Sequence, residues 1–553
     1  MSIPGEADVL IAGGGPCGLM LANELGRRGI SVVLIDEKPS TAFNPQANAT
    51  QARTMEHYRR LGIARDVRSA GLPAEYPTDI AYFTRYATYE LARYSLPSAK
   101  QATDVVKRLS GSWSAAELPH RVSQKFVETV LRRHAEALPD ISVNYSWRLV
   151  SFTQDDEGVT ALIEKADGSA RQNVRAVYLV GADGPRSKTR EALGFSLGGE
   201  TGVQRDFMGG RMCAVYLRAP DLYRVVPNPA AWMYVTFNGD RRTFMAAVDG
   251  KGEFAFHTQL RANEDEDAIT DDMAKAMFLR AVGADMPVEV LARGFWTAGH
   301  ALVADGFQKG RVFIGGDAAH LFTPAGGLGY NTAIEDAVNL GWKLAASLKG
   351  KAGPHLLDTY QDERQPLARR NTAYARGFAD SLGWREAPPE LEEGNEQGTK
   401  ARDEAGDYFN AHARREFNIP GVTFGGRYDG SPIIISDGSA PPPDTPNEYV
   451  PTACPGGRPP HLWIDEQTSL YDLFGFEWTL LVTQADVSTN TFEDAAAQMG
   501  LNLKVVHLDQ PAVRELYQAP LALIRPDQIV SWRGTDTAQA LQVLRKANGF
   551  ALD

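Results

Sequence analysis

Apolar runs near the N-terminus predict a strand, a helix and a second strand in succession. The run Asp8–Ala12 (DVLIA) is continuous and apolar, as expected of a buried strand, and it ends in a glycine-rich turn. A helix is expected over about Gly15–Arg28, and a second apolar strand over Ser31–Ile35 (SVVLI). This strand-turn-helix-strand order is the local context that a dinucleotide-binding fingerprint requires.

A different pattern occupies the middle of the chain, where short apolar segments are broken by Pro, Gly and Asp turns. Strands are predicted over Met212–Ala219, Ala231–Phe237 and Arg242–Asp249, and together they should form a sheet. The stretch Glu386–Ala405 is charged and has little apolar periodicity, so we expect an exposed linker there. A turn-rich run, Ser436–Pro460, leads into the C-terminal part.

The C-terminal part predicts a small unit of strands and helices. Only Cys454 lies in or near it, so no CxxC pair can form and we expect a structural role for this unit, not a redox role. Its predicted order is strand, helix, strand, hairpin and helix, over Trp478–Val482, Phe492–Met499, Leu503–Leu508, Leu521–Trp532 and Thr537–Lys546.

The turn after the first strand has the glycine spacing of a dinucleotide site. Gly13 permits the tight turn, Gly15 lets the backbone approach a pyrophosphate, and Gly18 allows close packing of helix on sheet. Asp36 ends the second strand, where a carboxylate can bind the ribose hydroxyls. The glycines alone would fit an ordinary turn, but strand, helix and acid in register predict a bound dinucleotide. The predicted binding residues of this segment are Gly13, Gly15, Pro16, Cys17, Gly18, Asp36 and Glu37.

Two later stretches indicate which dinucleotide is bound. The segment YLVGADGPRSKTR contains Asp183 and Gly184 after an apolar strand, and RVFIGGDAAH contains Gly316 and Asp317 after another. Each piece alone fits a turn or a helix cap. The three in this order, before a long helix over Gly329–Leu348, resemble the FAD-binding signatures of the para-hydroxybenzoate hydroxylase family of aromatic monooxygenases (class A FAD-dependent monooxygenases).

The resemblance assigns roles to individual residues. Asp317 is expected beside the ribityl hydroxyls, and Pro324–Asn331 should present backbone N–H groups at a helix N-terminus to the flavin pyrimidine edge. Gln124, in PHRVSQKFVETVL, is similar to a glutamine that contacts the flavin. Gln46 stands where the family has an arginine, and a neutral amide cannot offset diphosphate charge. The further implied FAD-site residues are Arg53, Asp183, Gly184, Gly316, Pro324, Gly327, Gly329, Tyr330 and Asn331.

The resemblance covers nearly the whole chain and implies an α/β fold. It comprises a Rossmann-like FAD-binding domain of the glutathione-reductase type, an inserted β-sheet substrate domain and a C-terminal thioredoxin-like domain, as in the phenol hydroxylase and hydroxyphenylpropionate hydroxylase branch. The implied boundaries are 1–190 with 290–380 for the FAD-binding domain, 191–289 with about 80–105 for the substrate domain, 381–418 for a helical, charged linker and 419–553 for the thioredoxin-like domain.

Composition limits the partners. The length of 553 residues suggests three or four domains, and the formal net charge of −12, with no basic run, argues against nucleic acid. No stretch reaches the ~18 to 20 apolar residues of a membrane span, so we expect no membrane association and a cytoplasmic protein. The spacing of Cys17, Cys213 and Cys454, and of the ten histidines, predicts no metal site. His320 has no visible acid-base partner, and we expect it to be a structural residue of the helix beside the FAD.

The implied activity is that of a single-component FAD monooxygenase. By resemblance, NADPH or NADH reduces the flavin, dioxygen forms a flavin C4a-hydroperoxide, and a phenolic aromatic substrate is hydroxylated. A homodimer is left open. Two alternatives also remain open: a Baeyer-Villiger oxygenation of a polyketide ketone, and a non-catalytic flavin-binding or regulatory protein.

Candidate substrate residues lie in the predicted central sheet. Arg211, Tyr216, Tyr234 and His257 could polarise a phenol, and Pro324 lies in the loop before the long helix. Each of these sheet residues also has a simpler interpretation. The tyrosines would pack in the core, and Arg211 would be a surface charge.

Overall fold

The computed structural model describes residues 3–201, 207–383 and 385–551, and its N-terminal layer is an eight-stranded sheet with a parallel centre. Strand β1 (Glu6–Ala12) pairs in parallel with β2 (Val32–Asp36) on one side and with β10 (Arg171–Gly181) on the other. The predicted strands and the helix between them, α1 (Pro16–Gly26), are confirmed. The sheet is completed by β7 (Ile141–Tyr145), β8 (Trp147–Gln154), β9 (Val159–Lys165), β18 (Gln308–Lys309) and β19 (Val312–Ile314).

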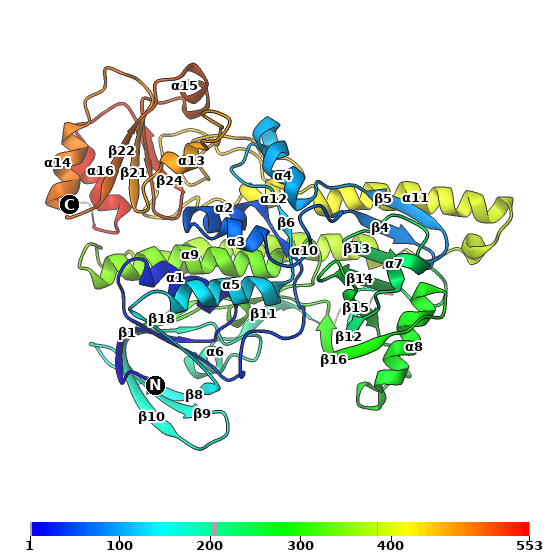
Figure 1. Cartoon of the computed structure of the whole chain (residues 1–553). Helices are drawn as coiled ribbons and strands as arrows, with labels where there is room; N and C mark the ends of the chain where they lie inside the picture. The colour runs from blue at the N-terminus through cyan, green and yellow to red at the C-terminus, as the bar shows by residue number, and fades with distance from the viewer. Residues whose placement is uncertain (1–2, 202–206, 384, 552–553) are drawn as a thin grey trace.

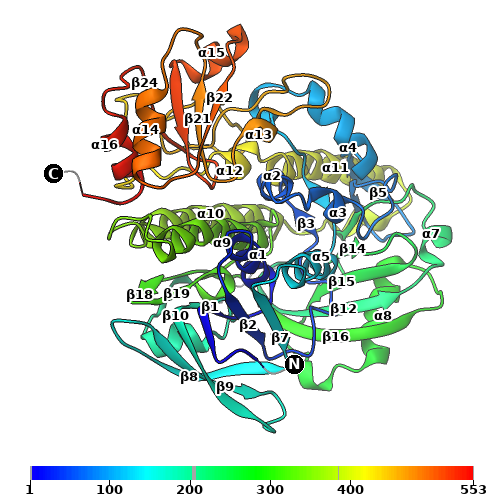
Figure 2. The ribbon, with the colours of Figure 1, turned by 60° about the vertical axis from the view of Figure 1, so that its left-hand side comes forward.

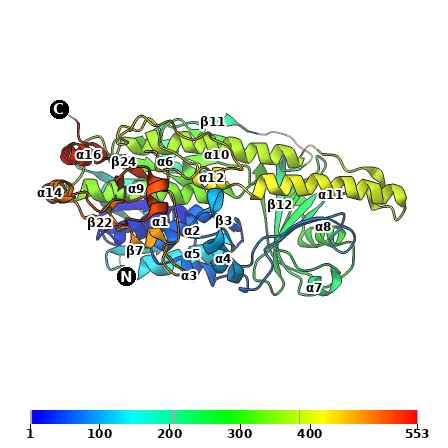
Figure 3. The same cartoon turned by 90° about the horizontal axis from the view of Figure 1, so that it is seen from above.

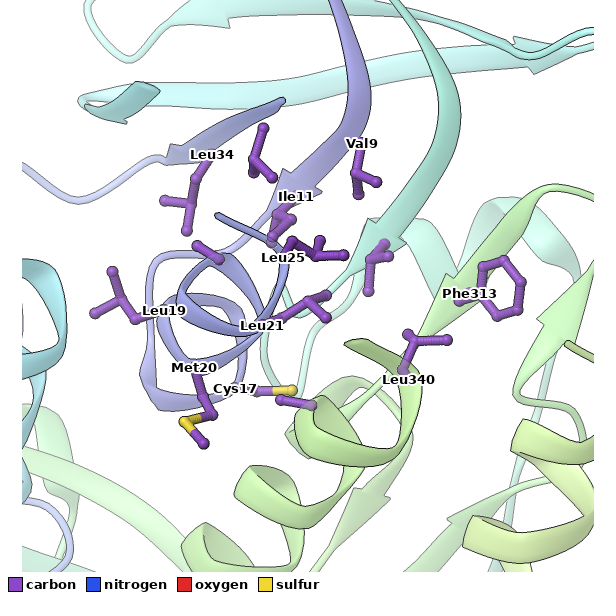
Figure 4. Close-up of a cluster of buried hydrophobic side chains, with 14 of the residues drawn as sticks. Val9, Ile11, Cys17, Leu19, Met20, Leu21, Leu25, Leu34, Phe313 and Leu340 are labelled. Carbon is purple, nitrogen blue, oxygen red and sulfur yellow. The ribbon is translucent and has the colours of Figure 1, made fainter. Parts of the chain in front are cut away.

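Helix α1 packs between this sheet and α9 (Leu328–Leu348), the long helix predicted from the sequence (Figure 4). Leu21 and Leu25 lie beside the sheet, and Cys17 lies toward α9. Both faces of α1 are covered, which explains its apolar character all round. Gly341 allows the close approach of the two helices, because a Cβ there would lie 2.6 Å from the Cβ of Glu24.

A second sheet has seven strands in the order β16-β12-β15-β14-β13-β4-β5. All neighbours in it are antiparallel except β4 and β13. Helix α8 (Asp271–Val282) covers one face, where Phe278 contacts Phe256 edge-on. The three strands predicted in the middle of the chain are present. The strands are β4 (Ile80–Phe83), β5 (Glu90–Tyr94), β12 (Gly210–Arg218), β13 (Met233–Thr236), β14 (Thr243–Ala247), β15 (Glu253–Gln259) and β16 (Glu289–Ala298).

The charged stretch Glu386–Ala405, predicted to be an exposed linker, is largely exposed, but its second half is the start of a helix that packs on the second sheet. Helix α11 (Glu396–Phe417) begins there, and Phe409 stacks on Tyr82 of β4 with ring centroids 4.7 Å apart. The apolar residues that anchor this helix lie beyond the charged stretch, so the stretch alone had no periodicity. Figure 3 shows α11 running along the second sheet to one end of the molecule.

The C-terminal unit is a four-stranded sheet in the order β22-β21-β23-β24, flanked by helices. Figures 1 and 2 place it across α9 and α10 (Thr359–Gly383) from the N-terminal sheet. The predicted order is confirmed, although α15 (Pro511–Tyr517) was not predicted. Its elements are β21 (Trp478–Val482), α14 (Asn490–Gln498), β22 (Leu503–His507), β23 (Leu521–Ile524), β24 (Val530–Gly534) and α16 (Ala540–Ala547).

Buried ion pairs fix the C-terminal unit to the rest of the chain. Arg525 donates to both carboxylate oxygens of Glu363 on α10, at 2.7 and 2.9 Å, and Lys343 of α9 donates to the same carboxylate at 2.7 Å. The side chains of all three are fully buried. Arg458 donates from Nε to Glu56 at 3.0 Å. The contact surface between the C-terminal unit and the rest of the chain is therefore buried like the protein interior.

Shorter elements connect these layers. No helix of the described residues is long and apolar enough to cross a bilayer. The connecting elements are α2 (Ala52–Arg60), α3 (Ala64–Arg68), α4 (Ala99–Val105), α5 (Gln124–Glu136), α6 (Lys188–Leu193), α7 (Leu222–Val225), α12 (Pro420–Phe424), α13 (Leu470–Leu473), β3 (Ala49–Thr50), β6 (His120–Arg121), β11 (Leu197–Glu200), β17 (Ala301–Ala304) and β20 (His320–Leu321).

Candidate functional site

The turn between β1 and α1 admits only glycine at two positions. Gly13 has φ +117°, and a Cβ there would lie 2.0 Å from the carbonyl oxygen of Ala182. A Cβ on Gly18 would lie 1.9 Å from the carbonyl oxygen of Gly13. Both distances are far below van der Waals contact, so the first and third glycines of the motif are explained by packing within the protein.

Gly15 differs, because a Cβ there would meet no protein atom within 4 Å. It is the N-cap of α1, no side chain caps that helix, and its first turn contains no acidic residue. An uncapped helix N-terminus beside open space is suited to bind an anion such as a pyrophosphate. Pro16 and Cys17 begin the helix, and burial raises the pKa of the Cys17 thiol well above its ordinary value, so it stays protonated.

Asp36 lies at the end of β2, against the same turn. Its Oδ2 accepts the N–H of Gly14 at 2.7 Å, and its Oδ1 accepts the N–H of Lys38 at 2.8 Å. The Tyr145 hydroxyl donates to the Gly14 carbonyl at 3.0 Å. The carboxylate is thus fixed in place, with further lone pairs for ribose hydroxyls. Glu37 is exposed beside it.

Asp183 is occupied by its own chain. It accepts the backbone N–H and the hydroxyl of Thr189, both at 3.0 Å, at the start of α6. Gly184 has φ +80°, which suits glycine, and a Cβ there would meet nothing within 4 Å. The capping interpretation therefore accounts for the Asp183 carboxylate.

The Asp317 carboxylate has no partner of this kind. Its side chain is exposed, and no hydrogen bond or ion pair joins its carboxylate to another residue in the described part of the chain. Desolvation by surrounding protein raises its pKa, while nearby His320 and Lys38 lower it. Gly316, at φ +62°, packs against Cys17 of α1, because a Cβ there would lie 3.1 Å from the Cys17 Cβ. Asp317 is therefore held beside the α1 turn with its oxygens available to a ligand.

The start of α9 forms the other side of the site. Its N-cap is Gly327, at φ +65°, and no side chain caps the helix. The N–H of Gly326 is not free, since it donates to Glu416 at 2.9 Å. Asn331 accepts the N–H of Gln51 at 2.8 Å and donates to the Ala49 carbonyl at 3.0 Å, which ties α9 to β3.

Three further predicted residues surround this turn. Pro324 is exposed, and Gly329 packs toward Phe322, with a Cβ position 3.3 Å from that ring. The Tyr330 hydroxyl hydrogen-bonds the Tyr58 hydroxyl at 2.5 Å. The segment is thus positioned by contacts with β3, α2 and α11, elements distant in sequence.

The loop before β3 is held by α5. Gln124 donates to Glu128 at 2.7 Å, and Glu128 accepts the N–H of Ala42 at 2.7 Å. Burial raises the pKa of Glu128, although the hydrogen bonds from Ala42 and Gln124 lower it. Gln46 is exposed in this loop.

The structure gives Arg53 a different set of partners from the one predicted. Its Nη2 donates to the backbone carbonyls of Asp527 and Gln528, at 3.0 and 2.9 Å. The guanidinium is buried against the C-terminal unit and also pairs with Glu56. It anchors that unit, because its donors are already taken by these partners.

A buried network beneath the site was missed. His320 lies in β20, not in a helix, and its Nε2 is 2.6 Å from Asp336 on α9. Arg364 donates to the other Asp336 oxygen at 2.8 Å. Burial opposes ionisation of Asp336, but His320 and Arg364 hold its pKa below the ordinary value. The three side chains are fully buried, so their role is structural, and no local pattern predicts the network because its members lie on three different elements.

The central sheet separates the four candidate substrate residues onto two faces. In the antiparallel register, Tyr216 lies opposite Ala255 and Ala214 opposite His257, so Tyr216 and His257 share a face. Arg211 pairs with Glu266 and donates to Thr297 at 3.2 Å on the other face. Tyr234 packs on that face too, stacked on Phe83, with its hydroxyl accepting the Ala231 N–H at 3.0 Å. Packing therefore accounts for Tyr234.

His257 belongs to an aromatic group. It stacks on Phe244 with ring centroids 4.4 Å apart, and Trp296 donates to its Nδ1 at 3.3 Å. Burial lowers the pKa of His257 to about 4, so it is neutral at pH 7. Tyr216 lies on the same face, where Lys125 donates to its hydroxyl at 2.9 Å and Glu253 accepts from it.

No cluster of His, Cys, Asp and Glu in the described ranges could hold a metal ion. A recess of about 620 Å³, lined by Glu75, Asp79 and Lys100 among others, contains none of these residues. The uncapped start of α1, the open space at Gly15 and the available Asp317 fit a dinucleotide. Asp36 would hold its ribose.

Comparisons with known proteins agree with this geometry. Residues 6–375 match the family model described as FAD binding domain, and residues 452–549 match that described as aromatic-ring hydroxylase, C-terminal. The chain is 30% identical to phenol 2-monooxygenase of Pseudomonas sp. (strain EST1001), over 96% of this chain and 90% of that protein. It is also 30% identical to aklavinone 12-hydroxylase RdmE of Streptomyces purpurascens, over 98% of each.

Solved structures give the same result. The rebeccamycin biosynthetic enzyme RebC with reduced flavin is 33% identical, with a TM-score of 0.88 over 100% of both chains. A ternary complex of aklavinone-11 hydroxylase with FAD and aklavinone is 27% identical, with a TM-score of 0.81 over 99% of this chain and 100% of the other. The three-part α/β fold class expected from the sequence is confirmed.

Proposed function

Because this chain belongs to the family of FAD-dependent aromatic-ring hydroxylases, and is an FAD-dependent monooxygenase, we propose that it hydroxylates a phenolic aromatic compound with dioxygen and NADPH or NADH. The observation that carries the proposal is the available Asp317 carboxylate between two uncapped helix N-termini. The presence of candidate binding groups on both sides of the proposed cofactor site supports an enzyme over a non-catalytic flavoprotein.

Bound FAD would supply the redox chemistry, taking electrons from the nicotinamide and activating dioxygen. The residues of this chain bind and orient it. The α1 N-terminus at Gly15 would bind the pyrophosphate, Asp36 the adenosine ribose and Asp317 the ribityl hydroxyls. The N-terminal dipole of α9 would stabilise negative charge on the flavin pyrimidine edge.

An aromatic substrate is supported by the face of the second sheet that contains His257, Phe244 and Trp296. These rings offer apolar surface and a neutral imidazole. Relatives named as a phenol monooxygenase and as aklavinone hydroxylases bracket the size of substrate that we propose, from a single phenol ring to a fused polyketide phenol.

The reaction is tested by substrate-stimulated oxidation of NADPH and NADH. Simple phenols, hydroxyphenyl acids, nitrophenols and fused polyketide phenols are screened for stimulation, and the best is then turned over under isotopically heavy dioxygen. One labelled oxygen on the ring is the expected result. A labelled lactone or ester would show Baeyer-Villiger oxygenation instead of hydroxylation. Stimulated oxidation that yields only hydrogen peroxide would mark the compound as a pseudosubstrate. The absence of stimulation by any compound, with fully bound and reducible FAD, would contradict the proposal.

A further inference from the structure

Arg121 lies one strand away from the start of α9. It is in β6, where it pairs directly with Ala49 of β3. The Ala49 carbonyl accepts from Asn331, and the Ala49 Cβ is 3.0 Å from the position that a Cβ on Gly327 would take. Arg121 is therefore at the edge of the turn that we assign to the flavin ring.

The Arg121 guanidinium is buried without a counter-ion. The residue is 5% exposed, and within the described ranges it has no side-chain hydrogen bond or ion pair. Its neighbours are the rings of Trp232, 4.5 Å from the guanidinium carbon, and Phe417, at 5.8 Å. Burial lowers the pKa of Arg121 to about 10, while Tyr94 and Glu416 raise it. The group is thus still cationic at pH 7.

Three other buried arginines are each paired with an acid. Arg364 contacts Asp336, Arg458 contacts Glu56 and Arg525 contacts Glu363. Glu416 is the carboxylate that raises the pKa of Arg121, but it is already hydrogen-bonded to the N–H of Gly326 and to His412. A buried cation without an anion is costly, so its retention beside the flavin turn calls for a partner that arrives from outside.

Trp232 adds a second donor at the same place. It is 1% exposed, and its indole Nε1–H has no acceptor among the described residues. It directly precedes β13, so it belongs to the second sheet, whereas Arg121 belongs to the FAD-binding part. The pair therefore lies where the second sheet meets the FAD-binding part.

We propose that Arg121, supported by Trp232, binds a carboxylate carried by the aromatic substrate. A guanidinium offers parallel N–H donors to such delocalised oxygens, and stacking on Trp232 holds its plane. The inference rests on the proposed function. It assigns Arg121 a role in substrate choice, and it predicts that neutral analogues bind poorly.

The test uses FAD-loaded full-length enzyme and two probes, 3-hydroxy-2-naphthoate and its methyl ester. Binding is followed by the difference spectrum of the bound flavin, without NADPH or NADH. We expect the wild type to prefer the acid by about 10- to 100-fold, since charge-assisted hydrogen bonds have that magnitude. Arg121→Met should abolish the preference, Arg121→Lys should keep part of it, and Trp232→Phe should weaken it.

Arg224→Met is the matched control. Arg224 lies in α7 with 77% of its side chain exposed, and its loss should leave the preference intact. Equal binding of acid and ester by the wild type, or binding of neither probe, would overturn the carboxylate site. So would an unchanged preference in a folded, FAD-loaded Arg121→Met. These outcomes do not depend on turnover, so a failure of the proposed hydroxylation would be recognised separately by the oxidation assay.

Discussion

Three carboxylates mark the candidate dinucleotide site, and their hydrogen bonds give each a different capacity for ligand. Asp183 is engaged at the start of α6, and Asp36 is partly engaged by the turn that it fixes. Asp317 alone of the three keeps both oxygens free of partners in the described part of the chain. Its loss should therefore affect a ligand more than the fold.

We expect Asp317→Ala to lose FAD while the chain stays folded. Removing a charge-assisted hydrogen bond costs about 1.5 to 3 kcal/mol, which corresponds to roughly 10- to 150-fold in dissociation constant. The measurement is flavin absorbance after gel filtration, with circular dichroism for folding. Asp305→Ala, at an exposed acid before β18, is the control and should retain FAD. Wild-type flavin occupancy in Asp317→Ala would contradict the assignment.

Two glycines of the same turn should respond oppositely to alanine. Gly15→Ala has open space for its Cβ, so the protein should keep its melting temperature but bind FAD more weakly, because the methyl group occupies the pyrophosphate position. Gly13→Ala places a Cβ against the Ala182 carbonyl and should lower the melting temperature. Thermal unfolding with and without added FAD separates the two effects. Undiminished FAD affinity in Gly15→Ala would refute our placement of the pyrophosphate.

At the residue scale, the sequence predicted positions whose role is fixed locally. The glycines and Asp36 follow from a short motif with its strand and helix. The contacts of Arg53 with Asp527 and of His320 with Asp336 were not predicted, because each partner lies in a different element of the fold. Arg121 lies in the segment PHRVSQKFVETVL, but the sequence assigned it no role, and its burial without a counter-ion is what distinguishes it.

At the scale of elements, α11 shows how a helix depends on residues outside its most conspicuous stretch. Its charged first half suggested a linker, whereas its second half packs on the second sheet and its Glu416 holds the turn before α9. Strands and helices with continuous apolar runs, such as β1 and α9, were predicted within a few residues. Tertiary packing decided α11, and that packing has no local signal.

Phe409→Ala should therefore destabilise the protein. The Phe409 ring is fully buried against Tyr82, and such a truncation costs about 3 to 5 kcal/mol. Chemical denaturation measures the free energy of unfolding. Asp407→Ala, on the exposed side of the same helix, should change it by less than about 0.5 kcal/mol. Equal small effects of both substitutions would mean that α11 is a loosely attached linker after all.

At the scale of the whole molecule, the C-terminal unit is joined to the FAD-binding part through its interior. Trp478 contacts Trp342 of α9 edge-on at 5.8 Å, beside the ion pairs of Glu363 with Arg525 and Lys343. The order of strands and helices in this unit was predictable from apolar runs. Its docking was not, because the charged residues that join it to α9 and α10 resemble ordinary surface residues in the sequence.

The ion pairs give this docking a pH dependence. Burial opposes the charge on Glu363, but Arg525 and Lys343 hold its pKa well below its ordinary value of 4.5. A carboxyl whose folded pKa is lowered contributes stability that is complete above the unfolded pKa and is lost as pH falls below it. Acid should therefore weaken the attachment of the C-terminal unit below about pH 4.5.

Glu363→Gln should weaken the attachment of the C-terminal unit already at neutral pH. It leaves Arg525 and Lys343 buried without their anion, and breaking one side of a buried pair costs about 3 to 5 kcal/mol. We expect a lower melting temperature at pH 7, a flatter dependence of stability on pH below about 4.5, and faster proteolytic cleavage in the turn-rich segment before the C-terminal unit. Glu136→Gln removes an exposed pair with Arg132 and should change stability by no more than about 1 kcal/mol. If Glu363→Gln kept the wild-type melting temperature and protease resistance, the unit would be held by its apolar contacts alone, and the buried charges would have to be explained by something other than docking.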